Sequence, residues 1–172
     1  MVNARWFVSV SALATLGWGG AVAAQGYQKG DKVALAKGVA TARVSLKGGL
    51  SASATHGQPI SGKFEIEDGR LQLSAYTAKA GKFFEVIVDY ATGKIVKAEP
   101  ITGGEDLSAA KEQSAAMGQA KVPLGTATAT ALKQNPGFRA VSVIPSLKGG
   151  RPVADITLVK EQEFKTVSVP LQ

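Results

Sequence analysis

Residues 83–96 read FFEVIVDYATGKIV, a stretch that begins as a β-strand and stops at a turn. The first residues alternate between apolar and polar side chains, which is typical of a half-buried strand. The segment DYATG breaks this alternation, and KIV resumes it. The pattern predicts a strand, a tight turn and the start of another strand.

The residues of this turn have the properties that a structural turn needs. Asp89 can accept a hydrogen bond from the backbone two residues further on, and Gly93 can adopt a positive φ. We therefore interpret the turn as the end of a strand rather than as a reactive site. Its motif residues are Asp89, Tyr90, Thr92 and Gly93. The alternative is an acidic binding loop formed by Asp89 and Tyr90.

The residues before this stretch predict two further strands. FEIE at 64–67 and LQLSA at 71–75 each alternate between apolar and other residues. Asp68-Gly69 between them is a strong hairpin signal, and Ala80-Gly81 turns the chain again. The three strands form an antiparallel sheet with one apolar face, which helices must cover.

The same order of features occurs twice in the chain. ATARVSL at 40–46 is similar to GQAKVPL at 118–124, so that Ala42 corresponds to Ala120. Further along, Gly69-Arg70 matches Gly150-Arg151. The sequence separation between the matched residues is three positions larger in the second match than in the first. We attribute this difference to one longer hairpin loop in the second copy.

Helices are expected at the start of each copy. Residues 32–41 have apolar residues at helical spacing and are rich in Ala. Ser45 is placed to cap a second helix, and Pro123 occupies the matching position as a first helical residue. GTATATAL at 125–132 alternates as a strand would, but its place in the repeat favours a helix, which we predict.

The predicted fold class is α+β, as a tandem repeat. Each unit has one or two N-terminal helices packed on a small antiparallel sheet. The first unit covers residues 25–99, a linker covers residues 100–105, and the second unit covers residues 106–172. Pro100 cannot donate a ladder hydrogen bond, so we place the boundary there.

One family shares this order of features. The hairpin around Asp68-Gly69-Arg70 and the final strand FEVIVDYATGKIV resemble the PepSY domain. The second unit is similar as PVADITLVKEQEFKTVSVPL, but Pro170 stands where the first unit has Asp89, so this repeat is degenerate. PepSY-like domains occur in propeptides of thermolysin-type peptidases, in exported proteins and in membrane-bound reductases. The resemblance implies a free-standing exported module that could restrain a peptidase.

Residues 1–24 have the layout of a signal peptide. Arg5 is their only charged side chain, an apolar run follows it, and AVAA precedes Gln25. We expect cleavage after Ala24. Cleavage after Ala23 and an uncleaved membrane anchor are the alternatives. Loss of Arg5 lowers the formal net charge from +7 to +6. The layout predicts a periplasmic or secreted protein with no membrane span after cleavage.

The residue counts exclude several kinds of chemistry. The chain has no Cys and one His, His56, which excludes disulfides, thiolate nucleophiles and paired histidines. Glu65 and Glu67 share a strand face, as Glu161 and Glu163 do if their segment is extended. Paired carboxylates can act as acid and base or bind Ca²⁺. Because these alternate with apolar residues, we place them on the wet face of a sheet and predict no catalytic residue, cofactor or metal.

Binding functions remain. The 20 Lys and Arg residues are spread singly along the chain, so we expect no nucleic-acid partner. We predict a non-catalytic module that restrains or escorts a peptidase or another envelope protein through a sheet edge or face. The alternative is a periplasmic protein that binds a small ligand or anion in the groove between the repeats.

Overall fold

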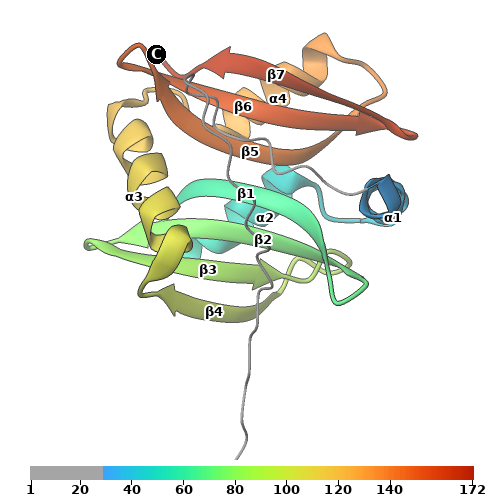
Figure 1. Cartoon of the computed structure of the whole chain (residues 1–172), viewed down its shortest axis with the longest axis horizontal. Helices are drawn as coiled ribbons and strands as arrows, with labels where there is room; N and C mark the ends of the chain where they lie inside the picture. The colour runs from blue at the N-terminus through green and yellow to red at the C-terminus, as the bar shows by residue number, and fades with distance from the viewer. Residues whose placement is uncertain (1–28) are drawn as a thin grey trace, which may run out of the picture.

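The computed structural model describes residues 29–172 (Figure 1). The predicted signal peptide, residues 1–24, and its cleavage position lie outside this range. The helices in the range are α1 Lys29–Thr41, α2 Leu46–Ser53, a 3₁₀ helix Ala54–His56, α3 Gly104–Gln119 and α4 Leu124–Gln134. The strands are β1 Gln58–Glu67, β2 Arg70–Lys79, β3 Lys82–Val88, β4 Ile95–Ile101, β5 Arg139–Lys148, β6 Arg151–Lys160 and β7 Glu163–Pro170.

The seven strands of the described range form one antiparallel sheet in the order β4-β3-β2-β1-β5-β6-β7. The predicted α+β class is therefore confirmed. A small sheet in each unit was predicted, and instead the two sets of strands join at β1 and β5. Gly62 pairs with Val143, and Lys63 pairs with Ser142. A single sheet therefore runs through both halves of the chain.

The hairpins form where their turn residues predict them. Asp68 and Gly69 have φ values of +49° and +74° and join β1 to β2. Ala80 and Gly81, at +50° and +74°, join β2 to β3 in the same way. Two successive residues with positive φ match the right-handed twist of the flanking strands. This explains why short Gly-containing pairs were reliable signals.

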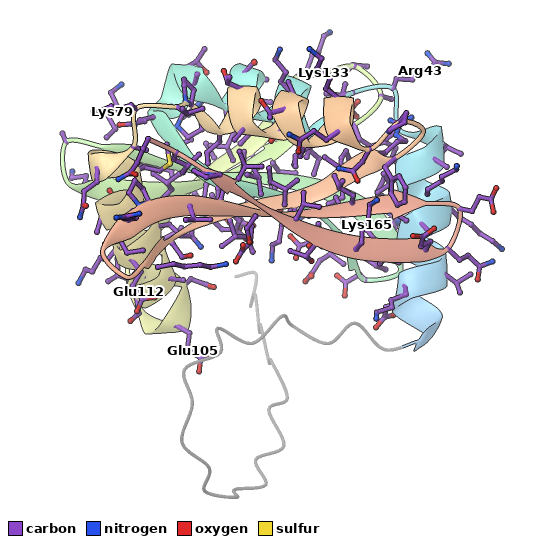
Figure 2. All side chains as sticks on the ribbon, turned by 90° about the horizontal axis from the view of Figure 1, so that it is seen from above. Arg43, Lys79, Glu105, Glu112, Lys133 and Lys165 are labelled. Atoms are coloured by element: carbon purple, nitrogen blue, oxygen red, sulfur yellow. The ribbon has the colours of Figure 1, made fainter. Side chains whose placement is uncertain are left out.

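The helices divide between one face of the sheet and its two ends. α2 and α4 lie side by side on one face, while α1 and α3 stand at opposite ends (Figure 2). Gly49 lets α2 approach β2 closely, because a Cβ there would lie 2.8 Å from Cδ2 of Leu73. The largest fully buried side chains come from both halves of the chain: Leu35, Val39, Leu46, Ile60, Phe64, Leu73, Val86, Val88, Val141, Ile156, Leu158 and Leu171. One continuous core therefore serves the whole sheet.

The second helix of the first half begins as predicted, whereas in the second half Pro123 is the N-cap residue rather than the first helical residue. The Ser45 side chain accepts the backbone N–H of Gly48 at 3.1 Å and caps α2. Pro123 immediately precedes α4, which has no side-chain cap. The prediction of a helix over residues 125–132 is confirmed by α4. The Thr128 hydroxyl donates to the carbonyl of Leu124 at 2.8 Å, which satisfies a buried polar group inside the helix.

Two details of the sequence interpretation were wrong. The three extra residues are not in a hairpin loop: residues 135–138 connect α4 to β5, whereas Gly57 alone connects the 3₁₀ helix to β1. Pro100 does not end the ladder either, since it lies within β4 opposite Phe84. β4 is an edge strand, where a residue without an N–H is tolerated. β4 ends at Ile101 and α3 begins at Gly104, so most of the expected linker belongs to regular elements.

Candidate functional site

The motif turn is organised by the carboxylate of Asp89. Its Oδ1 accepts the backbone N–H of Ala91 at 3.0 Å and of Thr92 at 2.6 Å, and the Thr92 hydroxyl at 2.9 Å. Gly93 has φ +78° and donates its N–H to the Asp89 carbonyl at 2.8 Å. The hydrogen bonds from the side chain and backbone of Thr92 lower the pKa of Asp89, because they favour its ionised form.

The same turn holds the junction between α1 and α2. The Tyr90 carbonyl accepts the backbone N–H groups of Arg43 at 3.0 Å and Val44 at 2.9 Å. The Tyr90 side chain is exposed and none of these contacts uses it. The four motif residues therefore meet in one turn, whose hydrogen bonds fix the backbone and join a strand end to two helices.

The carboxylates of β1 face a partly buried polar network. Glu65 forms an ion pair with Lys63 at 2.7 Å and accepts the Ser74 hydroxyl at 2.8 Å. Burial, and then the charge of Glu65, raise the pKa of Glu67. Glu65 is half-buried and Glu67 is exposed. The face of the sheet that was predicted to be in contact with solvent is therefore only partly exposed. The two glutamates share one face of β1, as predicted.

Other predicted candidates are not brought together. Glu161 lies in the turn between β6 and β7 with φ +55°, and Glu163 begins β7, so they do not share a strand face. His56 lies at the end of the 3₁₀ helix, where its Nδ1 is 3.0 Å from the hydroxyl of Thr55. Within residues 29–172 no three His, Asp or Glu side chains are grouped closely enough to hold a metal ion.

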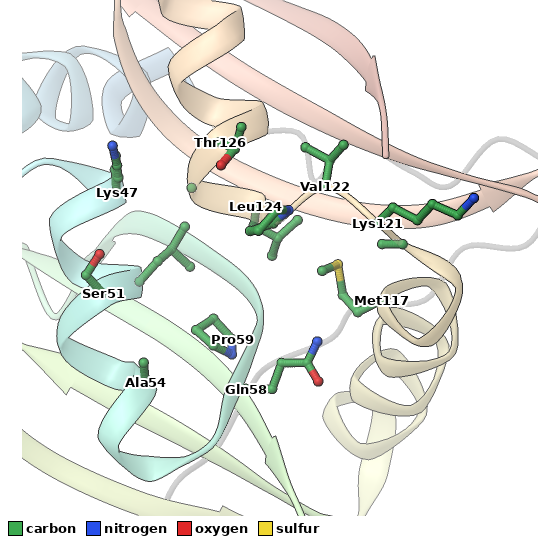
Figure 3. Close-up of a pocket in the computed structure, with 14 residues that line it drawn as sticks. Lys47, Ser51, Ala54, Gln58, Pro59, Met117, Lys121, Val122, Leu124 and Thr126 are labelled. Carbon is green, nitrogen blue, oxygen red and sulfur yellow. The ribbon is translucent and has the colours of Figure 1, made fainter. Parts of the chain in front are cut away.

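A cleft of about 400 Å³ opens between α2 and the segment that joins α3 to α4 (Figure 3). Its apolar wall is made by Leu50, Ala54, Pro59, Met117, Ala120, Val122, Pro123 and Leu124. Its other lining residues are Lys47, Ser51, Gln58, Lys121, Gly125 and Thr126. The volume and the mostly apolar lining with a few polar groups are within the range of small-molecule sites.

The charge at this cleft has one sign. Lys47 and Lys121 lie at opposite ends of the cleft, with their ammonium groups directed away from its centre (Figure 3). No Asp or Glu is among the lining residues. The sequence predicted a groove between the repeats, but none of these residues was assigned to it. Residues 120–124 were recognised only as part of the repeated stretch GQAKVPL, and no local signal indicated that they line a cleft.

No family model and no curated protein sequence matches the chain. Among solved structures, the crystal structure of a "putative lipoprotein" from Clostridium difficile is similar with a TM-score of 0.45 and 10% sequence identity. The similarity covers 76% of this chain and 88% of the other. In residues 29–172, none of the helices has the length and apolar character that a bilayer crossing requires.

Proposed function

We propose that the chain is a non-catalytic, exported binding module built from two PepSY-like units. The units are residues 25–99 and residues 106–172, with residues 100–105 between them. The observation that carries the proposal is the cleft, which is formed by helices from both units and lined by groups suited to binding. The lining side chains are apolar groups, hydroxyls, an amide and two lysines, and no carboxylate or imidazole is among them.

The strands support the duplication. β1 has a bulge at Ile60, between Pro59 and Ser61, and β5 has a bulge at Val141, between Ala140 and Ser142. The separation of Ile60 from Val141 equals that of the matched hairpin glycines, Gly69 and Gly150. Bulges are specific features of a strand rather than defects. Their recurrence at equivalent positions is what two copies of one unit would produce.

The contacts between strand ends and helices support it further. In the first unit the Tyr90 carbonyl accepts the N–H groups of Arg43 and Val44. In the second unit the Leu171 carbonyl accepts the N–H groups of Lys121 at 2.6 Å and Val122 at 3.1 Å. The donor residues of the two units are separated by the same number of positions as Ala42 and Ala120. The acceptor residues are separated by the same number of positions as Gly69 and Gly150. This correspondence gives the contact between strand end and helix junction a structural role in both units, and the second unit makes it without the motif turn.

The partner class follows from the resemblance to PepSY domains and from the predicted signal peptide. We propose a periplasmic or secreted module that restrains or escorts a peptidase or another envelope protein. Interaction modules of this kind dock peptide segments in grooves or along strands.

The experiment that tests this partner class uses residues 25–172 with periplasmic extract and with secreted peptidases, and the heat-unfolded chain as the control. A specific co-purifying protein or slowed peptidase activity is the expected result. If no protein co-purifies specifically and no peptidase is slowed, the proposal is removed.

A small-ligand protein is the second candidate function. It is favoured by Lys47 and Lys121 at the ends of the cleft, which suit an anion. A ligand that binds only the native state raises the melting temperature. We would measure melting curves with anions and lipids for the wild type and for Lys47→Gln/Lys121→Gln. Lys133→Gln is the control, since this lysine of α4 is not among the lining residues. Flat profiles would count against this function.

A further inference from the structure

One arginine joins the two halves of the molecule. Arg139, the first residue of β5, donates from Nη2 to the Ala42 carbonyl at 2.6 Å and from Nη1 to the Ala40 carbonyl at 3.4 Å. These carbonyls lie at the C-terminal end of α1, where a helix carries partial negative charge. The second half of the chain therefore supplies the cation that satisfies the end of the first helix.

The corresponding place in the other half is the cleft. Gln58, the first residue of β1, is the counterpart of Arg139, and Ala120 is the counterpart of Ala42. Gln58 and Ala120 both line the cleft. In the described part of the chain, Gln58 makes no side-chain hydrogen bond to the end of α3. Within the same range, no arginine bonds the Gly118 and Ala120 carbonyls, the counterparts of Ala40 and Ala42.

Other filling groups are also missing on this side. Ala54 lines the cleft, and its counterpart is the half-buried Leu132 of α4. The connection to the strand is Gly57 alone, where the other half has residues 135–138. The cleft is therefore the counterpart of a site that the chain fills with its own side chains elsewhere.

The chemistry of the filled site indicates what the cleft would accept. We propose that the cleft receives an arginine and an adjoining apolar side chain from a protein partner, with the guanidinium at the Gly118 and Ala120 carbonyls. This inference rests on the proposed binding function and names the partner's chemistry. A guanidinium can bond two acceptors at once, which an ammonium cannot do in the same way. The flexible Met117 adapts the apolar wall to the incoming side chain.

The lysines at the ends of the cleft do not exclude a cation. Arg43 is the counterpart of Lys121, and the first unit accommodates Arg139 at a junction that contains Arg43. The filled site thus already combines two cationic residues. What it adds is the pair of helix-end carbonyls, whose counterparts in the second unit belong to Gly118, which is exposed, and to Ala120, which lines the cleft.

The test uses capped dipeptides and NMR titration of residues 25–172. The probes are acetyl-leucyl-arginine amide, its lysine analogue of equal charge and its glutamine analogue. We expect the arginine peptide to shift amide signals of Gly118, Ala120 and Lys121, and to bind about tenfold more tightly than the glutamine peptide, since hydrogen bonds to charged groups are the stronger ones. Decanoate serves as an anionic apolar probe in the same titration. Equal binding of the arginine and lysine peptides, or tighter binding of decanoate than of the arginine peptide, would overturn the proposal.

A variant that fills the cleft from within provides the matched control. Ala54→Leu/Gln58→Arg imports the residues of the other half, so the melting temperature should be unchanged or higher while peptide binding is lost. Gln58→Arg alone serves if the double variant does not fold. Retained peptide binding in a folded variant would contradict the inference. A protein partner that binds wild type and filled variant equally would keep the proposed function and remove only this site.

Discussion

At the scale of single residues, the carboxylate of Asp89 is the group on which the motif turn depends. It accepts three hydrogen bonds from Ala91 and Thr92. Asp89→Ala removes all three and frees the Tyr90 carbonyl from its position at the α1–α2 junction. We expect a melting temperature a few degrees lower, measured by circular dichroism. Asp89→Asn keeps an acceptor oxygen and should lose less, whereas an unchanged Asp89→Ala protein would show that the turn is not structural.

The ionisation of Asp89 makes part of this contribution depend on pH. Its pKa is lower in the folded state because Thr92 donates hydrogen bonds to the charged form. The resulting stabilisation is present at neutral pH and is lost as pH falls through the folded-state pKa. We therefore expect the difference in melting temperature between wild type and Asp89→Asn to narrow between pH 7 and about pH 3, below the ordinary pKa of an aspartate. A constant difference would show that charge is not involved.

At the scale of elements, the docking of α1 depends on Arg139. Its guanidinium donates to the Ala40 and Ala42 carbonyls from the other half of the chain. Arg139→Gln should cost about 1.5–3 kcal/mol of unfolding free energy, the usual range for hydrogen bonds to a charged group. The amides of α1 should also exchange with solvent faster than those of α2. Arg151→Gln, at an exposed hairpin position, is the control and should change neither measurement.

The sequence predicted the elements well wherever the signal was local. The hairpin turns at Asp68-Gly69 and Ala80-Gly81 could be predicted from their glycines, which adopt positive φ readily. In the structure the residue before each glycine has a positive φ as well. The helix over residues 125–132 was harder, because Thr at alternate positions suggests a strand. The structure resolves the conflict by burying Ala127, Thr128 and Ala131 at helical spacing. The extra residues at 135–138 were misplaced because a sequence offset does not say which loop is longer.

At the scale of the whole molecule, neither the joined sheet nor the lining of the cleft could be predicted. The joint consists of the pairs Gly62–Val143 and Lys63–Ser142, and no pattern in either strand specifies the other as its neighbour. The cleft combines residues from α2, the start of β1 and the α3–α4 segment, which are far apart in sequence. A groove between the units was a reasonable expectation, but its lining depends on how the units pack.

The continuous core predicts that neither half folds alone. Buried residues of both halves belong to one cluster, and α2 packs beside α4 across the junction of the sheet. Units of about 70 residues bury too little surface to be more than marginally stable. Residues 25–102 and residues 103–172, expressed separately, should therefore lack a cooperative thermal transition and should recover native circular dichroism when mixed. The exposed β1 edge of an isolated first half should also promote association, which sedimentation would detect. A separate half that melts cooperatively within about 10 °C of the whole chain would contradict this, because a shift of that size leaves most of the stability in one unit.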